Sequence, residues 1–396
     1  MESIKTTAMI FFGCLLIFAM PATTYDVKDL ERLAEGNNKF SMDVYQKLKK
    51  PNENLVVSPI SIQLVLALVY AGAKGNTAKE IANALHLPEN LDEVLKGHKM
   101  LLEQLQHPTL KIASKSFIEK TFNVKPEFQE LASKYFLSDA GLMNFIGDPE
   151  GSRKEINKWV QEKTNDKIKD LLKEGTIDAL TRLVLTNAIH FKANWASKFN
   201  EALTIDDDFY VTPENKVKVK MMVKKEKFPF RMHQELDAKI LELPYEDKEF
   251  KMIIILPNKI DGLPEVENKL SKMNLVEEMS KLHEVTVNVK LPRFKIENTH
   301  DLADTLIALG IKDLFSEADA NLSGISDERL SASKAIQKAF IEVNEEGTEA
   351  AAATATLVES RSLLVAFEKQ FEVNRPFIYL ISKKLTPIFI GSIRKF

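Results

Sequence analysis

Residues 342–356 read EVNEEGTEAAAATAT, and this stretch is the most informative in the chain. Glutamates and a glycine come before residues 348–356, which are alanine and threonine apart from one glutamate. Beyond the stretch, Arg361 is the only lysine or arginine between Lys338 and Lys369. A long segment without basic residues that ends in one arginine is typical bait for a protease that cuts after arginine.

As an extended strand, this segment has two different faces. Alternate residues from Thr348 to Val358 are small or β-branched and uncharged, whereas Glu349 and Glu359 fall on the opposite face. Gly347 gives backbone freedom where the chain must turn. We therefore expect a strand that can enter a sheet with its Thr348 face inward. A flexible linker or an alanine-rich helix is the alternative, because alanine favours helix, although the threonines weaken it.

Length and composition indicate an ordinary globular protein. The chain has 396 residues, 44% hydrophobic and 28% charged, with a formal net charge of -3 and a pI near 6.2. This balance gives no reason to expect nucleic acid or an anionic membrane as the main partner. We find no internal repeat and no Pro/Gly/Ser-rich linker, which favours one large domain over two or three.

The N-terminus reads as a secretion signal. Lys5 precedes the apolar run of residues 8–20, which is short for a bilayer span and fits a signal-peptide core. We expect a signal peptide at about residues 1–22, a mature domain over 23–396 and an extracellular location; a buried N-terminal helix is the alternative. The only cysteine, Cys14, lies in this leader, so the mature chain has no thiol and no disulfide.

The patterning along the chain predicts an α+β fold, with helices early and strands late rather than in regular alternation. Residues 61–73 read as a helix buried on all sides, and residues 156–172 as an amphipathic helix. The strand candidates are residues 216–223, 252–256, 285–291, 336–343, 377–381 and 386–393.

The usual signatures of catalysis are missing from the sequence. There is no G-x-S-x-G elbow, no phosphate-binding loop, no G-x-G-x-x-G and no H-E-x-x-H. The seven histidines are scattered without a pair at ligand spacing. We therefore predict no catalytic residue, no metal and no enzymatic activity.

Two surface features remain open. The first is a lysine cluster that could bind a heparin-like polysaccharide, or that could be a solvated strand face whose charge discourages edge pairing; it comprises Lys216, Lys218, Lys220, Lys224, Lys225 and Lys227. The second is the glycosylation sequon at Asn321, which is followed by Leu322 and Ser323.

A set of motifs gives the chain a family resemblance. In order they are NLVVSP at 54–59, GAKGNT at 72–77, TNAIHFK at 186–192 with Trp195 following, LPRF at 291–294, KAFIEVNEEGT at 338–348, NRPF at 374–377 and PIFIG at 387–391. With these motifs the chain resembles the serpins, a family of serine protease inhibitors, over essentially its whole mature length. The amino-acid sequence of the hinge and the lack of cysteines are most similar to those of inhibitory serpins of insect haemolymph.

The resemblance implies a serpin fold of three β-sheets with eight or nine helices, and an exposed reactive-centre loop at about residues 343–370. The family's spacing from the hinge glycine implies a reactive bond between Arg361 and Ser362. The implied hinge comprises Glu345, Glu346, Gly347, Thr348, Glu349, Ala350, Ala351, Ala352, Ala353 and Thr354. The implied protease-contact residues are Leu357, Val358, Glu359, Ser360, Leu363 and Leu364.

The resemblance also implies the activity. After cleavage the loop inserts into the largest sheet and traps the protease, so we expect a secreted suicide inhibitor of a trypsin-like serine protease. The expected partner is that protease in a covalent 1:1 complex with a monomeric inhibitor, with no required cofactor and, by analogy alone, a role in insect immunity. A non-inhibitory carrier or storage serpin is the alternative, although such members tend to have charged, bulky or proline residues in the hinge.

Overall fold

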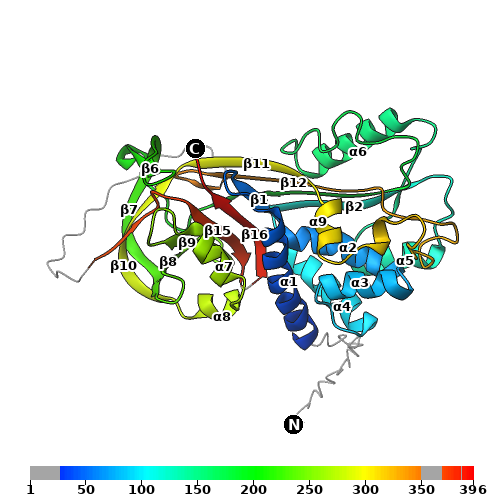
Figure 1. Cartoon of the computed structure of the whole chain (residues 1–396), viewed down its shortest axis with the longest axis horizontal. Helices are drawn as coiled ribbons and strands as arrows, with labels where there is room; N and C mark the ends of the chain where they lie inside the picture. The colour runs from blue at the N-terminus through cyan, green and yellow to red at the C-terminus, as the bar shows by residue number, and fades with distance from the viewer. Residues whose placement is uncertain (1–26, 349–367, 385) are drawn as a thin grey trace, which may run out of the picture.

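The computed structural model describes residues 27–348, 368–384 and 386–396, so the predicted leader lies outside it. Helices are concentrated in the first half, as the sequence pattern predicted (Figure 1). Within the described residues the helices are α1 (Val27–Leu48), α2 (Pro59–Gly72), α3 (Gly75–Ala84), α4 (Leu91–Leu105), α5 (Pro126–Phe136), α6 (Pro149–Lys163), α7 (Leu263–Leu270), α8 (Leu275–Ser280) and α9 (Ala303–Ala308), with the short 3-10 helices η1 (Glu201–Leu203) and η2 (Asp313–Phe315).

The strands form two hydrogen-bonded sheets in the described part of the chain. The strands are β1 (Leu55–Val57), β2 (Leu110–Glu119), β3 (Gly141–Met143), β4 (Leu183–Phe191), β5 (Ala193–Asn194), β6 (Ile205–Tyr210), β7 (Lys216–His233), β8 (Ala238–Pro244), β9 (Phe250–Pro257), β10 (His283–Pro292), β11 (Phe294–Asp301), β12 (Lys334–Val343), β13 (Gly347–Thr348), β14 (Lys369–Glu372), β15 (Phe377–Lys383) and β16 (Thr386–Ile393).

One sheet has seven strands in the order β3-β2-β4-β12-β13-β5, with β11 paired to the outer side of β12. Its central strands β4 and β12 run parallel, in register from Lys334 opposite Val184 to Phe340 opposite His190. The two-residue strand β13 lies at one end of the sheet, between β12 and β5.

The other sheet has nine strands, in the order β1-β16-β15-β9-β8-β7-β10-β14 with β6 paired to β7. Strand β7 is 18 residues long and pairs in turn with β6, β10 and β8. Hydrogen bonding through this strand makes one continuous ladder where the resemblance led us to expect two separate sheets. The fold class is otherwise as predicted, with nine α-helices among the described residues.

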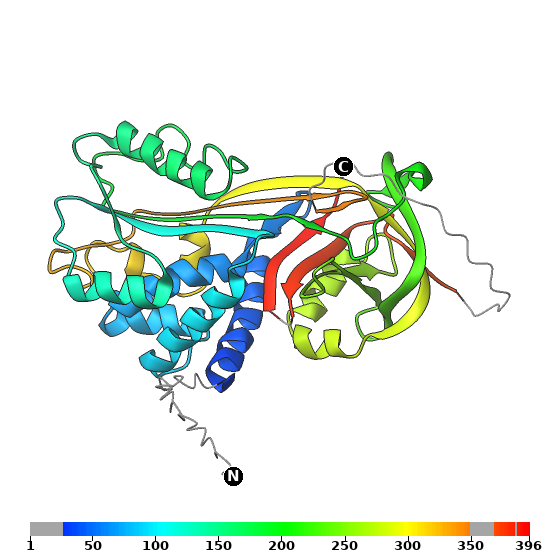
Figure 2. The ribbon, with the colours of Figure 1, turned by 180° about the vertical axis from the view of Figure 1, so that it is seen from behind.

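The seven-stranded sheet is covered on both faces. Helix α6 lies over one face, while α2 and neighbouring helices lie under the other (Figures 1 and 2). On the α6 side, Ile156 and Val160 pack with Phe117 of β2 and Ala188 of β4. Alternate residues of the same strands face the helices below, as Leu185 does when it packs with α2. This alternation is the period-two pattern of a sheet buried on both faces.

Helix α2 confirms the prediction of a helix buried on all sides. Its N-cap is Ser58, Pro59 occupies the first turn, and only Tyr70 of its 14 residues is not fully buried. Proline suits this first position because its missing N–H would have no partner there in any case. One face of the seven-stranded sheet packs on this helix.

The predicted helix over residues 156–172 is wrong at both ends. Helix α6 starts earlier, where Asp148 caps the N–H of Gly151, and stops at Lys163. Asn165 and Asp166 then adopt positive φ angles of 51° and 61°, a conformation that ends a helix. The apolar residues beyond them still enter the core under α6, which explains why the helical periodicity seemed to continue.

Candidate functional site

The hinge predicted from the sequence begins inside the sheet. Thr348 pairs with Val343 of β12 on one side and with Ala193 of β5 on the other, and Gly347 pairs with Asn194. Gly347 and Thr348 therefore already form a strand between β12 and β5, which continues the line of β4. This confirms for Thr348 the expectation that its face enters a sheet.

A tight turn brings the chain back after β12. The backbone N–H of Asn344 donates to the carbonyl of Gly347 over 2.9 Å, and the Asn344 side-chain oxygen accepts from Glu346 and Gly347. Gly347 has a φ of +150°, and a Cβ there would lie 2.1 Å from the carbonyl oxygen of Ala193. Only glycine fits this position, both for its φ and for the close backbone contact.

Thr348 is fully buried against an aromatic pair. Its hydroxyl lies 2.9 Å from the Tyr245 hydroxyl, and Tyr245 is itself inaccessible to solvent. The Tyr245 ring stacks on Trp195, with centroids 4.6 Å apart and an interplanar angle of 9°. Burial raises the pKa of Tyr245, so the phenol is neutral at physiological pH. The pocket for residue 348 thus accepts a small neutral side chain.

The two glutamates before the glycine anchor the turn. Glu345 is 6% exposed, and its carboxylate accepts from the Arg293 guanidinium at 2.6 Å and from the Thr204 hydroxyl. Glu346 pairs with Lys198. These carboxylates bind to partners on the neighbouring strands and loops, so they hold the start of the hinge in place.

Hydrogen bonds to the backbone carbonyls of residues 344–346 also hold the turn in place. The Trp195 N–H donates to the carbonyl of Glu346 over 2.8 Å, and its indole Nε1 donates to the carbonyl of Asn344 over 2.9 Å. The Phe199 N–H donates to the carbonyl of Glu345 over 2.9 Å. Sequence reasoning singled out Trp195 and Arg293 only as parts of motifs and missed Tyr245, Phe199 and Thr204.

Beyond β13, strands β4 and β12 pair directly with each other. A buried polar cluster connects these two strands. Gln337 of β12 donates to the side-chain oxygen of Asn187 on β4 over 2.8 Å and to the carbonyl of Ser58 over 2.8 Å. Asn187 in turn donates to the carbonyl of Ser61 over 2.8 Å and accepts from its hydroxyl over 2.6 Å. We call Ser58, Ser61, Asn187 and Gln337 the latch. A strand entering between β4 and β12 would have to break the bond from Gln337 to Asn187.

The loop bounds differ slightly from the predicted 343–370. Val343 is the last residue of β12, and Lys369 and Gln370 already belong to β14, which pairs with β10. The predicted reactive bond, the protease-contact residues and the hinge from Glu349 onward lie outside the described residues, within 349–367.

The lysine cluster does not form a single free basic face. Lys216 and Lys218 both pair with Asp208, at 2.7 and 2.8 Å, and Lys220 pairs with Asp206 at 2.9 Å. Two other lysines also have acidic partners. Lys224 lies 3.1 Å from Glu226, and Lys225 contacts Glu368. Lys227 is exposed. The carboxylates at 206–208 on strand β6 therefore offset the positive charge of the lysines on strand β7.

The sequon lies on the surface, where Asn321 is exposed and its side-chain oxygen accepts from the Ser323 hydroxyl over 2.8 Å. Across residues 27–348, 368–384 and 386–396, no group of three or more His, Cys, Asp or Glu side chains is arranged to hold a metal ion. In the same ranges no helix is both long and apolar enough to cross a membrane.

Comparison with known proteins adds an independent line of evidence. Residues 35–395 match the sequence model of the family described as Serpin (serine protease inhibitor). The leukocyte elastase inhibitor of Equus caballus is 39% identical over 365 residues, covering 89% of this chain and 96% of the relative.

Solved structures agree with this match. Serpin48 of the insect Tenebrio molitor, described as a highly specific serpin, superposes with a TM-score of 0.85 at 34% identity, covering 92% of this chain and 98% of that one. Human thyroxine-binding globulin with bound thyroxine superposes with a TM-score of 0.83 at 27% identity, covering 93% and 99%.

Proposed function

The chain belongs to the serpin family of serine protease inhibitors, and on that basis we propose that it is a secreted suicide inhibitor of a trypsin-like, arginine-specific serine protease. The observation that carries the proposal is the docked hinge. Thr348 already lies between β12 and β5, at the end of the slot that a longer strand would fill. The residues that follow in sequence alternate small or β-branched side chains with no charge on the Thr348 face.

The proposed mechanism follows from this geometry. The protease serine attacks the carbonyl of Arg361, the bond to Ser362 breaks, and the loop remains attached to the protease as an ester. Residues from Thr348 onward then add to the sheet between β4 and β12. From Thr348 to Arg361 is thirteen residues, or roughly 43 Å of extended chain at about 3.3 Å each. A protease carried that far from its docking site is held as the acyl-enzyme.

Arg361 sets the proposed specificity. It is the only basic residue between Lys338 and Lys369, and trypsin-like enzymes recognise arginine through an acidic primary pocket. The equine relative's name refers to leukocyte elastase, whereas this chain offers an arginine. Substrate preference at this one position therefore decides between the two target classes.

The test is a denaturing gel after incubation with trypsin and with elastase. We expect a covalent 1:1 complex with trypsin, and its loss in the Arg361→Ala variant. Arg231→Ala, which removes an arginine of β7 that pairs with Glu278, is the matched control and should form the complex normally. Clean cleavage by trypsin after Arg361 without any complex would contradict suicide inhibition, and it is the result that a carrier or storage serpin would give.

A second measurement separates the inhibitor from the carrier. Insertion adds a strand to the seven-stranded sheet, so cleavage should raise the thermal midpoint of the inhibitor markedly. A carrier that does not insert its loop would show no such rise. Thyroxine-binding globulin, to which the chain is similar in structure, is described with a bound hormone, so this comparison is a necessary one.

We also propose secretion with removal of about residues 1–22 and glycosylation of Asn321. Expression in insect cells, N-terminal sequencing of the medium fraction and treatment with an amidase specific for N-glycans test both points. Retention of the full-length chain in the cells would contradict secretion. A mass unchanged by the amidase would contradict glycosylation alone.

We propose that no polysaccharide cofactor is needed. The reason is that Lys216, Lys218 and Lys220 are paired with Asp206 and Asp208, so little net positive charge remains to attract a polyanion. Heparin at physiological salt should leave the rate of complex formation unchanged. A large acceleration that disappears in a Lys227→Ala variant would overturn this.

A further inference from the structure

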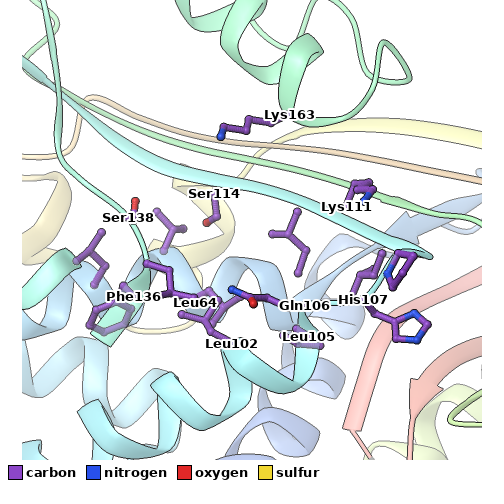
Figure 3. Close-up of a pocket in the computed structure, with 16 residues that line it drawn as sticks. Leu64, Leu102, Leu105, Gln106, His107, Lys111, Ser114, Phe136, Ser138 and Lys163 are labelled. Carbon is purple, nitrogen blue, oxygen red and sulfur yellow. The ribbon is translucent and has the colours of Figure 1, made fainter. Parts of the chain in front are cut away.

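A cavity of about 530 Å³ lies beside the seven-stranded sheet. Its walls come from α2, α4, the end of α5 and strand β2, and Lys163 at the end of α6 reaches it from above (Figure 3). This volume is within the range of about 300–1,000 Å³ that small-molecule sites occupy.

The inner wall of the cavity is apolar. Leu64 and Leu68 of α2 and Leu105 of α4 are almost completely buried and contribute to it. Ile112 of β2 and Phe136 at the end of α5 line it as well. Such a wall favours an alkyl or aryl group, because removing apolar surface from water is the main source of affinity in such sites.

The mouth of the cavity is cationic. Lys111 of β2 and Lys163 line it, and among the described lining residues none is acidic. Neither ammonium group has a carboxylate partner within the described residues, whereas Lys115, further along the same strand, pairs with Asp139 at 2.8 Å. Two unpaired ammonium groups next to an apolar wall are complementary to a ligand with one anionic end.

The strand at the mouth also has an open edge. Strand β3 pairs with β2 only at Phe117, Ile118 and Glu119, so residues 110–116 have no partner strand on that side in the described part of the chain. A ligand can therefore enter past the edge of β2 without displacing a neighbouring strand.

We propose that this cavity binds a long-chain carboxylate of the fatty-acid class. The alkyl chain lies between α2, α4 and β2, and the positive charge of Lys111 and Lys163 attracts the carboxylate. A sulfated polymer fits less well, because the interior offers it no polar partner. A neutral apolar ligand would leave both lysines unused. The proposal does not depend on the inhibitory function.

The test uses the uncleaved, delipidated protein and a dansyl-labelled undecanoate as a fluorescent probe, displaced by palmitate. We expect saturable 1:1 binding, with affinity falling about fourfold for each methylene removed from the competitor. The double variant Lys111→Gln/Lys163→Gln should bind palmitate about tenfold more weakly. Hexadecanol should bind both proteins equally and more weakly than palmitate binds the unmodified protein.

The matched control is Lys154→Gln/Lys158→Gln, which removes two exposed charges from the outer face of α6 and should leave palmitate binding unchanged. A Leu102→Trp variant fills the cavity and should abolish binding of both competitors, with its thermal midpoint confirming that it folds. The proposal is overturned by non-saturable binding, by equal affinity for palmitate and hexadecanol, or by palmitate affinity that is the same in the double variant.

Discussion

The hydroxyl of Thr348 lies 2.9 Å from that of Tyr245, and both side chains are fully buried between the end of β12 and the Trp195 ring. The site has room and hydrogen-bonding capacity for one small neutral residue. The pKa of Tyr245 is raised by burial, so no phenolate is present to neutralise a cation. This relationship makes residue 348 sensitive to substitution by a large or charged side chain.

Thr348→Arg should convert the protein from an inhibitor into a substrate of trypsin. Burying an unpaired guanidinium costs several kcal/mol, so insertion is slowed relative to release of the cleaved product. At 1.4 kcal/mol for each factor of ten, we expect the ratio of cleaved product to covalent complex to rise at least about tenfold. A gel time course measures it. Thr348→Ser keeps the hydroxyl and should inhibit normally, and equal inhibition by both variants would contradict the insertion role.

Reversing the charge of Glu345 should release the start of the hinge. In Glu345→Lys the new ammonium faces Arg293, which lies 2.6 Å from the present carboxylate. Because Arg293 is partly exposed, we expect a loss of about 2 kcal/mol in the free energy of unfolding rather than the larger cost of a fully buried pair. The urea midpoint of the uncleaved protein reports it.

The charge-swapped double variant Glu345→Lys/Arg293→Glu provides the control for that pair. It should recover part of the loss, since the two opposite charges are restored in exchanged positions. If the double variant is as unstable as the sum of the single variants, the ion pair is not the origin of the effect.

Gln337→Leu should destabilise the uncleaved form more than the cleaved form. In the uncleaved protein it removes the bond to Asn187 and leaves the Ser58 N–H without its acceptor, which costs about 2–3 kcal/mol for buried groups. After the proposed insertion a new strand separates β4 from β12, so the bond from Gln337 to Asn187 is already absent.

Thermal midpoints of both forms, measured for the variant and the unmodified protein, test this difference. Ser116→Ala on neighbouring β2 is the matched control, because its buried hydroxyl has no hydrogen-bond partner among the described residues, and it should affect both forms equally. An identical shift of both forms in Gln337→Leu would show that the latch does not act between the strands.

The sequence could predict what local pattern determines. Burial of Thr348 follows from the alternation after Gly347, and helix α2 follows from an uninterrupted apolar run after Ser58 and Pro59. The contacts that hold the hinge could not be predicted in this way. Tyr245 is 103 residues from Thr348 along the chain, and neither residue carries a local sign of the other.

One wrong prediction and one open alternative have the same origin. Apolar periodicity extended the helix at 156–172 past Lys163, because Ile168 and Leu171 are buried by the sheet and not by a helical face. The lysines at 216–220 left a basic patch open beside a solvated strand face, because Asp206 and Asp208 belong to a different strand, β6, which pairs with β7. In both cases tertiary contacts decide what a local pattern leaves open.

Acidification should destabilise the protein through His98 on α4. The side chain is fully buried and packs against Phe136; its Nδ1–H donates to the carbonyl of Val94, and Nε2 has no partner among the described atoms. Burial lowers the pKa of His98 to about 4. The unfolded chain, with a histidine pKa near 6.5, therefore binds the proton more strongly than the folded protein does.

The stability that the neutral imidazole provides is complete above pH of about 6.5 and is lost as the pH falls toward about 4, by about 3 kcal/mol in all. Urea midpoints between pH 7 and pH 4 measure the loss. His98→Phe retains an aromatic contact with Phe136 and removes the titrating group, so its midpoint should fall less steeply. His283→Phe, at an exposed position, should follow the unmodified protein. Parallel pH profiles for His98→Phe and the unmodified protein would exclude His98 as the source of the acid sensitivity.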